Sequence, residues 1–183
     1  MKVANEFRLR RRDLLASMLV PVASAALAAQ SAVRTRTTAT THFRIEVPEK
    51  DWRLLSAGIN TLACLIHKDD TASIVIEYEL LQIALRPEEV DANFAELEMT
   101  TIREREMSST GFTSRVDTAG RRRAVVDFQR RAPGGAEQVR VFVVVQGKQL
   151  YRLVCVAPAS QFAKFAPVFQ TVCGSFTPLD APA

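Results

Sequence analysis

The sequence has few of the side chains on which metal sites and nucleophilic catalysis depend. Its 183 residues contain only two histidines, His42 and His67, and three cysteines, Cys64, Cys155 and Cys173. It has no Cys-x-x-Cys pair, and its Pro-Gly-Gly segment joins two expected strands and does not begin a helix, unlike a phosphate-binding loop. We therefore predict no metal, no cofactor and no catalytic residue, so the protein is expected not to be an enzyme.

The sequence also lacks an apolar run of about 20 residues, the length that a membrane-spanning helix needs. The nearest candidate, residues 14–29, is shorter, consists largely of alanine and is interrupted by Ser17, Pro21 and Ser24. No cysteine follows it, so a lipoprotein anchor is not supported. The mature chain is thus predicted not to span a membrane.

The first 28 residues have the parts of a cleaved signal peptide: a basic start, a short apolar stretch and a small-x-small pattern. We predict cleavage after the pattern that ends the segment, with Ala26 and Ala28 at the cleavage site. Arg11 and Arg12, followed by Leu14 and Leu15, resemble a twin-arginine signal, although the general secretory route stays open. The expected location is periplasmic or secreted. A thylakoid lumen signal has the same parts, but the serine-rich transit region that would precede it is missing.

Most of the positive charge belongs to this signal. Residues 1–28 carry five basic and two acidic side chains, which account for +3 of the formal net charge of +4. The mature chain is therefore close to neutral, and we expect no nucleic-acid partner.

The mature chain is predicted to contain a flexible linker at 29–41, one domain at 42–177 and a disordered tail at 178–183. Alternating apolar residues and turn residues predict two groups of strands. The early strands are 43–47, 52–55, 61–67 and 73–85. The later strands, 112–117, 121–131, 137–146 and 149–157, follow one another through tight turns and form an antiparallel meander. In 121–131, Ala124, Val126 and Phe128 are expected inside, and Arg121, Arg123, Asp127, Gln129 and Arg131 outside.

Two helices complete the predicted α+β fold. The first runs from Pro87 to about Met107, and the acidic residues between Glu88 and Glu106 are expected to form a solvated face. Its packed face is predicted to contain Val90, Phe94, Leu97, Thr101 and Ile102. The second covers 161–173 and must lie on the sheet, because three phenylalanines line one side of it.

The order of these segments resembles the PsbP-like fold. The resemblance rests on Val47-Pro48 with Trp52 behind it, on the strand Tyr151-Arg152-Leu153-Val154-Cys155, and on the helix carrying Phe162, Phe165 and Phe169 before Ser175-Phe176. This fold is shared by the extrinsic photosystem II subunit, DcrB-like periplasmic proteins and a eukaryotic Ran-release factor. The resemblance implies an α/β/α sandwich around a mainly antiparallel sheet of six to seven strands, in proteins that mostly bind or assemble other proteins.

Two groups of residues remain as candidate sites. Cys155, in the last strand, and Cys173, at the end of the last helix, would form a disulfide if the helix packs on that strand. Otherwise they are buried apolar residues, as is expected of Cys64. Seven arginines are expected in adjacent strands, where they either bind an acidic partner or anionic lipid headgroups or protect strand ends against aggregation: Arg115, Arg121, Arg123, Arg131 and Arg140, together with Arg122 and Arg130.

Residues 67–70, His-Lys-Asp-Asp, are interpreted as a hairpin turn and not as a metal site. Two functions stay open. One is an exported, non-enzymatic binding or assembly protein that acts through protein contacts. The other is a periplasmic carrier of a small apolar molecule or lipid, held between sheet and helices.

Overall fold

The computed structural model describes residues 34–56 and 61–179. The predicted signal, with Arg11, Arg12, Leu14, Leu15, Ala26 and Ala28, lies outside the described residues. The strands and helices follow in chain order: β1 (Thr35–Ala39), β2 (Phe43–Pro48), β3 (Trp52–Ser56), β4 (Thr61–His67), β5 (Ser73–Leu85), the 3₁₀ turn η1 (Pro87–Glu89), α1 (Ala92–Arg105), β6 (Thr110–Asp117), β7 (Arg123–Ala132), β8 (Gly135–Pro158), α2 (Phe162–Ser175) and β9 (Thr177–Pro178).

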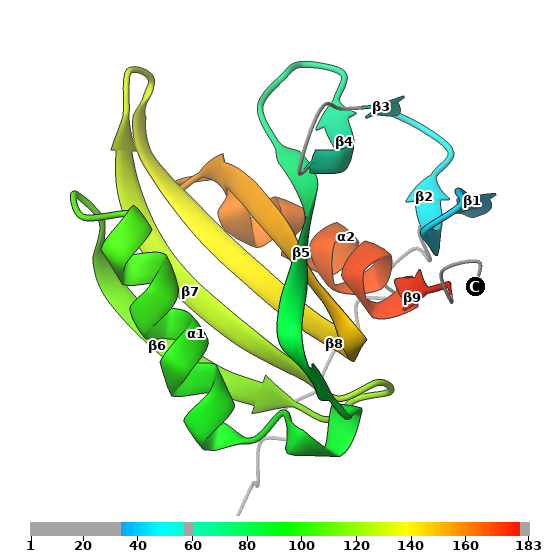
Figure 1. Cartoon of the computed structure of the whole chain (residues 1–183). Coiled ribbons are helices and arrows are strands. Elements are labelled where there is room, and N and C mark those ends of the chain that lie inside the picture. Colours follow the sequence, from blue (N-terminus) through cyan, green and yellow to red (C-terminus); the bar gives the residue numbers. More distant parts are fainter. Residues whose placement is uncertain (1–33, 57–60, 180–183) are drawn as a thin grey trace, which may run out of the picture. The chain divides into compact units, whose positions relative to one another are not determined.

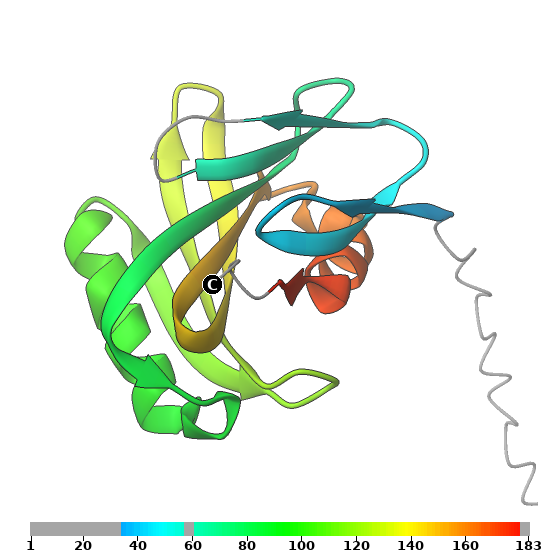
Figure 2. The same cartoon turned by 45° about the vertical axis from the view of Figure 1, so that its right-hand side comes forward.

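The main sheet has six strands in the order β3-β4-β5-β8-β7-β6, and a smaller sheet has the order β1-β2-β9. All neighbouring strands are antiparallel. Residues 135–143 of β8 pair with β7, and residues 147–156 pair with β5. Gly147, at the start of the second of these two arms, has a φ of 60°. Figure 2 shows β8 turning back between its two arms. The sequence-based strands at 137–146 and 149–157 correspond to the two arms.

The two helices cover opposite faces of the main sheet (Figures 1 and 2), which confirms the predicted α+β sandwich. On one face, α2 and strand β2 enclose a core with many aromatic residues, including Phe43, Trp52, Phe142, Tyr151 and Phe169. On the other, α1 lies over β6 and β7 and packs on valines of β7 and β8. Because α1 is limited to that end of the sheet, the neighbouring surface of β4 and β5 is left partly open.

The first helix differs from its prediction in both its start and its packed face. The chain forms η1 at Pro87 and begins α1 only after Asp91, whose carboxylate accepts a hydrogen bond from the Phe94 N–H at 2.9 Å. This cap is a strong helix-start signal. The buried residues of α1 are Ala95, Glu98, Met99 and Ile102, whereas Leu97 is 62% exposed.

The predicted linker and tail are corrected where they are described. Residues 35–39 form β1, which pairs with β2, so the second half of the expected linker is a strand. Pro178 pairs with Phe43, and the Leu179 N–H donates to the His42 carbonyl at 2.8 Å. Residues 180–183 of the predicted tail lie outside the described residues.

Strand β7 has the expected inside residues, Ala124, Val126 and Phe128, but only part of the expected outside face is exposed. All residues from 123 to 128 are buried, because α1 covers one face of this strand and Val125 and Arg123 contact the core beneath α2 on the other. The prediction that Arg123 and Asp127 point outward is therefore wrong: Arg123 is 3% and Asp127 is 9% exposed.

Candidate functional site

The candidate arginines do not form one free cationic surface. Arg115 and Arg140 both pair with Asp127, the latter at 2.7 Å from Nε to Oδ1. Arg123 pairs with Asp117 at 2.8 Å and donates to the Cys173 carbonyl at 2.8 Å. Three of the five arginines predicted to bind a partner thus already pair with carboxylates of their own sheet, and two of them share Asp127.

The remaining arginines lie in different places. Arg121 donates to Gln146 Oε1 at 3.0 Å, and Arg122 donates to the Glu88 carbonyl at 3.1 Å, so both connect the β6–β7 turn to neighbouring segments. Arg130 pairs with Glu137 at 2.8 Å. Arg131 is exposed and has no partner among residues 34–56 and 61–179. It is the candidate most available to a partner.

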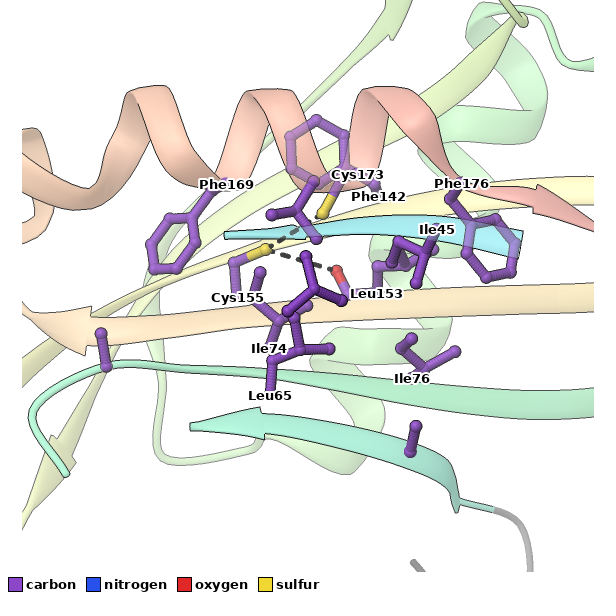
Figure 3. Packing of buried hydrophobic residues seen from close by; sticks show 14 of the residues in the cluster. Ile45, Leu65, Ile74, Ile76, Phe142, Leu153, Cys155, Phe169, Cys173 and Phe176 are labelled. Atoms are coloured by element: carbon purple, nitrogen blue, oxygen red, sulfur yellow. Dashed lines mark hydrogen bonds between the residues drawn. The ribbon is translucent and has the colours of Figure 1, made fainter. Parts of the chain in front are cut away.

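The structure brings Cys155 and Cys173 together, as Figure 3 shows. Their Sγ atoms are 3.4 Å apart, and both thiols are free and buried among Phe142, Phe169 and other core residues. Burial raises the pKa of the Cys155 thiol, and the neighbouring Cys173 raises it further. A buried thiol with a raised pKa, such as that of Cys155, is a poor nucleophile. The pairing of Cys155 and Cys173 as a disulfide stays a prediction.

The segment His67–Asp70 is a turn between β4 and β5, as predicted. The His67 ring is 8% exposed and packs edge to face against Trp52 and Phe165. Its Nδ1 atom lies 3.3 Å from the Thr71 hydroxyl. In the described part of the chain, no group of three or more histidine, cysteine or acidic side chains is placed to hold a metal ion.

A groove lies on the face that α1 leaves partly open. It consists of two cavities, of about 260 and 540 Å³, that share Glu77, Arg105 and Arg152. The smaller cavity lies between the end of α1 and the sheet, and its apolar lining comes from Val75, Ile102, Phe128, Val141, Val154 and Val156. The larger one follows β5 past the first residue of β4, where Thr61, Tyr78, Glu79 and Leu80 line it.

A buried ion-pair cluster crosses the middle of this groove. Arg152 of β8 is 5% exposed and binds Glu98 of α1 through two hydrogen bonds, of 2.9 Å from Nε and 3.2 Å from Nη2. Its Nη1 atom donates to Glu79 at 2.5 Å, and Glu79 also lies 3.7 Å from Arg105. The cluster connects α1, β5 and β8, so it sets the position of the helix that forms one wall of the groove.

The electrostatics of the cluster follow from burial. Burial raises the pKa of Glu98, while the guanidinium of Arg152 opposes that rise. For Glu79, the hydrogen bond from Arg152 lowers the pKa, and burial opposes this only in part. For Arg152 itself, burial favours the neutral form, but Glu98 and Glu79 together raise the pKa above its ordinary value. The groove therefore has charged groups that already pair with each other around an apolar floor, an arrangement suited to binding.

The sequence pattern did not reveal this cluster, because the acidic residues of α1 were expected to face solvent. Two signals were present. Glu98 lies three residues after Ala95 and four before Ile102, so it shares their helix face. Arg152 lies within a strand whose neighbours are almost all apolar. A buried arginine needs a carboxylate, and a helix face with one glutamate supplies it.

No family model matches this sequence, and no curated protein matches it. Solved structures do match its fold. Cyanobacterial PsbP (CyanoP) from Synechocystis sp. PCC 6803 has a TM-score of 0.56 and 9% identity, with 87% of this chain and all of that chain covered. LpqN of Mycobacterium tuberculosis, described as involved in cell envelope biogenesis, has a TM-score of 0.52 and 13% identity over 80% of this chain and 91% of that chain.

The Ran-binding protein Mog1p of Saccharomyces cerevisiae has a TM-score of 0.51 and 10% identity, with 81% of this chain and 97% of that chain covered. In the described residues, no helix has the length and apolar character needed to cross a membrane.

At identities of 9 to 13%, the likeness to these solved structures concerns the arrangement of strands and helices alone. These matches extend over most of the chain and confirm the resemblance that the segment order suggested: this chain has a PsbP-like fold.

Proposed function

We propose that this chain is an exported, non-enzymatic protein that binds another protein through the groove beside α1. The observation that supports this most directly is the half-buried apolar floor of the groove, at Val75 and Val154, which neither helix covers completely. Apolar surface that stays partly exposed in a folded chain is a common mark of an interaction site. The fold is shared with proteins such as Mog1p, described as Ran-binding, which is compatible with a binding role.

The groove is favoured over the arginine-rich face for a reason of charge. On that face, Arg115, Arg123 and Arg140 already pair with Asp127 and Asp117. An acidic partner would have to displace these carboxylates, and exposed pairs formed in exchange gain little free energy. Arg131 could contact an acidic partner without displacing a carboxylate of this chain, so it marks the alternative binding surface.

The carrier alternative needs an enclosed apolar space. Both helix–sheet interfaces are filled by packed side chains, with Phe165 and Phe169 at one and Met99 and Ile102 at the other. The groove volumes of about 260 and 540 Å³ belong to surfaces open to solvent, where a lipid chain would stay partly wet. We therefore place the carrier second.

The test is photo-crosslinking in the cells that export the protein. A photoreactive amino acid replaces Ser73, which lines the groove, or Leu80, which is 66% exposed at its far end. We expect both positions to capture the same protein. The matched control replaces exposed Arg131 on the opposite face of the sheet.

Three results decide between the alternatives. One recurrent protein at Ser73 and Leu80, but not at Arg131, supports the proposal. Capture at Arg131 alone would move the binding surface to the arginine-rich face. A small molecule at Ser73 with no protein would favour the carrier, and both of these outcomes contradict binding of a protein in the groove.

A further inference from the structure

Glu77 is the one charged side chain of the groove without a partner among the described residues. It lies on β5, lines both cavities and is half-buried. Directly across the strands lies Arg152, but that guanidinium donates to Glu79 and Glu98 instead.

The other arginines of the groove are also engaged elsewhere. Arg105 lies 3.7 Å from Glu79, and Arg130 pairs with Glu137 and Glu106. The undescribed residues 57–60, which precede β4, have the sequence Ala-Gly-Ile-Asn and contain no cation. Glu77 therefore depends on water within the groove for its solvation.

This dependence limits what can fill the groove. An occupant that covers the apolar floor also removes water from Glu77, and a desolvated carboxylate without a partner is costly. A purely apolar or an acidic occupant forms no new hydrogen bond to Glu77 that would offset this desolvation. A lysine or arginine replaces water with a charge-assisted hydrogen bond.

We propose that the partner's docking segment is an extended peptide that places a lysine or arginine on Glu77 and an apolar side chain in the smaller cavity. This inference rests on the proposed function, and it specifies the chemistry of the partner: a basic and an apolar side chain close together on one extended segment. The smaller cavity, about 260 Å³, has room for one or two apolar side chains and is small for a separate ligand.

An extended segment also suits the far end of the groove. There β5 continues beyond its described pairing with Thr61, and Leu80 lines the larger cavity with a side chain that is 66% exposed. A peptide that follows β5 on the groove face would cover Leu80 and cross Glu77 before it reaches the smaller cavity.

The experiment selects short random peptides, displayed on phage, against the purified full chain. We expect the binders to be enriched in lysine or arginine next to an apolar residue. The dissociation constant of the tightest peptide is then measured for the wild type and for three variants. Glu77→Gln should weaken binding by about 10- to 100-fold, because one charge-assisted hydrogen bond is lost. Glu104→Gln, which removes an exposed charge from the outer side of α1, is the matched control and should bind like the wild type.

Ser73→Trp separates this inference from the proposed function, since the indole would fill the smaller cavity. Thermal unfolding establishes that each variant is folded, and a photoreactive group on the peptide maps its position independently of any variant. If Ser73→Trp abolishes binding but Glu77→Gln does not weaken it, or if binders lack basic residues, the inference about Glu77 is wrong and the groove remains the site. If peptides bind equally to Ser73→Trp and crosslink outside the groove, both proposals fail.

Discussion

Arg152 should be one of the side chains on which the stability of this fold depends most. It is 5% exposed, and replacing it with methionine would leave Glu98, also 5% exposed, without its cation. Removing one partner of a buried ion pair typically costs about 3–5 kcal/mol, because the other charge stays buried and unpaired. For a domain of this size, that loss corresponds to a fall in melting temperature of about 6–20 °C.

The assay is urea and thermal unfolding of Arg152→Met at neutral pH, followed by far-UV circular dichroism. The variant should also show a characteristic pH dependence. Burial already raises the pKa of Glu98, and without Arg152 only the weaker attraction of Arg105 opposes that rise. The folded state then holds a proton that the unfolded state releases, so the free energy of unfolding should increase as the pH falls from 7 towards the ordinary glutamate pKa.

A second substitution checks the cause. Replacing Glu98 with leucine in the Arg152→Met background removes the stranded carboxylate and should restore most of the lost stability. Glu79 is half-exposed and can return to water. The control is Arg53→Met, which breaks an ion pair with Asp70 whose side chains are 59% and 73% exposed and should cost no more than about 1 kcal/mol. An Arg152→Met variant as stable as this control, or a double variant without recovery, would refute the reasoning.

Three further predictions concern other parts of the fold. Cys155 and Cys173 should resist thiol reagents in the folded protein and form a disulfide on oxidation, measured by mass spectrometry of the intact chain. Asp117→Asn should lower stability at neutral pH, and the difference from the wild type should shrink as the pH falls. Burial favours the protonated acid, but the hydrogen bonds from the Ala119 N–H and Arg123 lower the pKa of Asp117 overall. The stability that the carboxylate contributes is therefore lost as the pH falls through that pKa. Gly147→Ala should cost about 1–2 kcal/mol in urea unfolding, because an alanine is strained at a φ of 60°.

Each of these has its own control. Cys64 is only partly buried, so it should react first with thiol reagents, and equal reactivity of all three cysteines would contradict the packing in Figure 3. An Asp117→Asn difference that grows with acid would reverse the expected sign. Gly134→Ala lies in another turn without a positive φ and with open space around it, so it should be close to neutral.

Apart from β1 and β9, the succession of strands and helices was predictable, because local patterns determine it. Strands β4 (Thr61–His67) and β5 (Ser73–Leu85) begin and end where the sequence predicts. The aromatic face of α2 is also as expected, since Phe162, Phe165 and Phe169 all lie in the core. The packed face of α1 was not predictable in the same way, because the helix has two overlapping apolar faces. Contact with β6 and β7 buries the face that includes Glu98 and leaves Leu97 exposed.

The candidate sites depended on contacts between distant segments. The sequence placed Arg115, Arg123 and Arg140 in neighbouring strands, but it did not indicate that they would pair with Asp117 and Asp127. Such pairs follow from strand register and from the cover that α2 provides, both of which join residues far apart in the chain.

The sequence by itself determined the export prediction, the near-neutral charge of the mature chain and the α+β order of elements, because each depends on composition or on neighbours within a few residues. Tertiary structure decided which charges are buried. It joined Arg152 to Glu98 across 54 positions and left Glu77, directly opposite Arg152, without a partner in the described chain. The reason is physical: desolvation and ion pairing act over a few ångströms in space, and separation along the chain does not limit them.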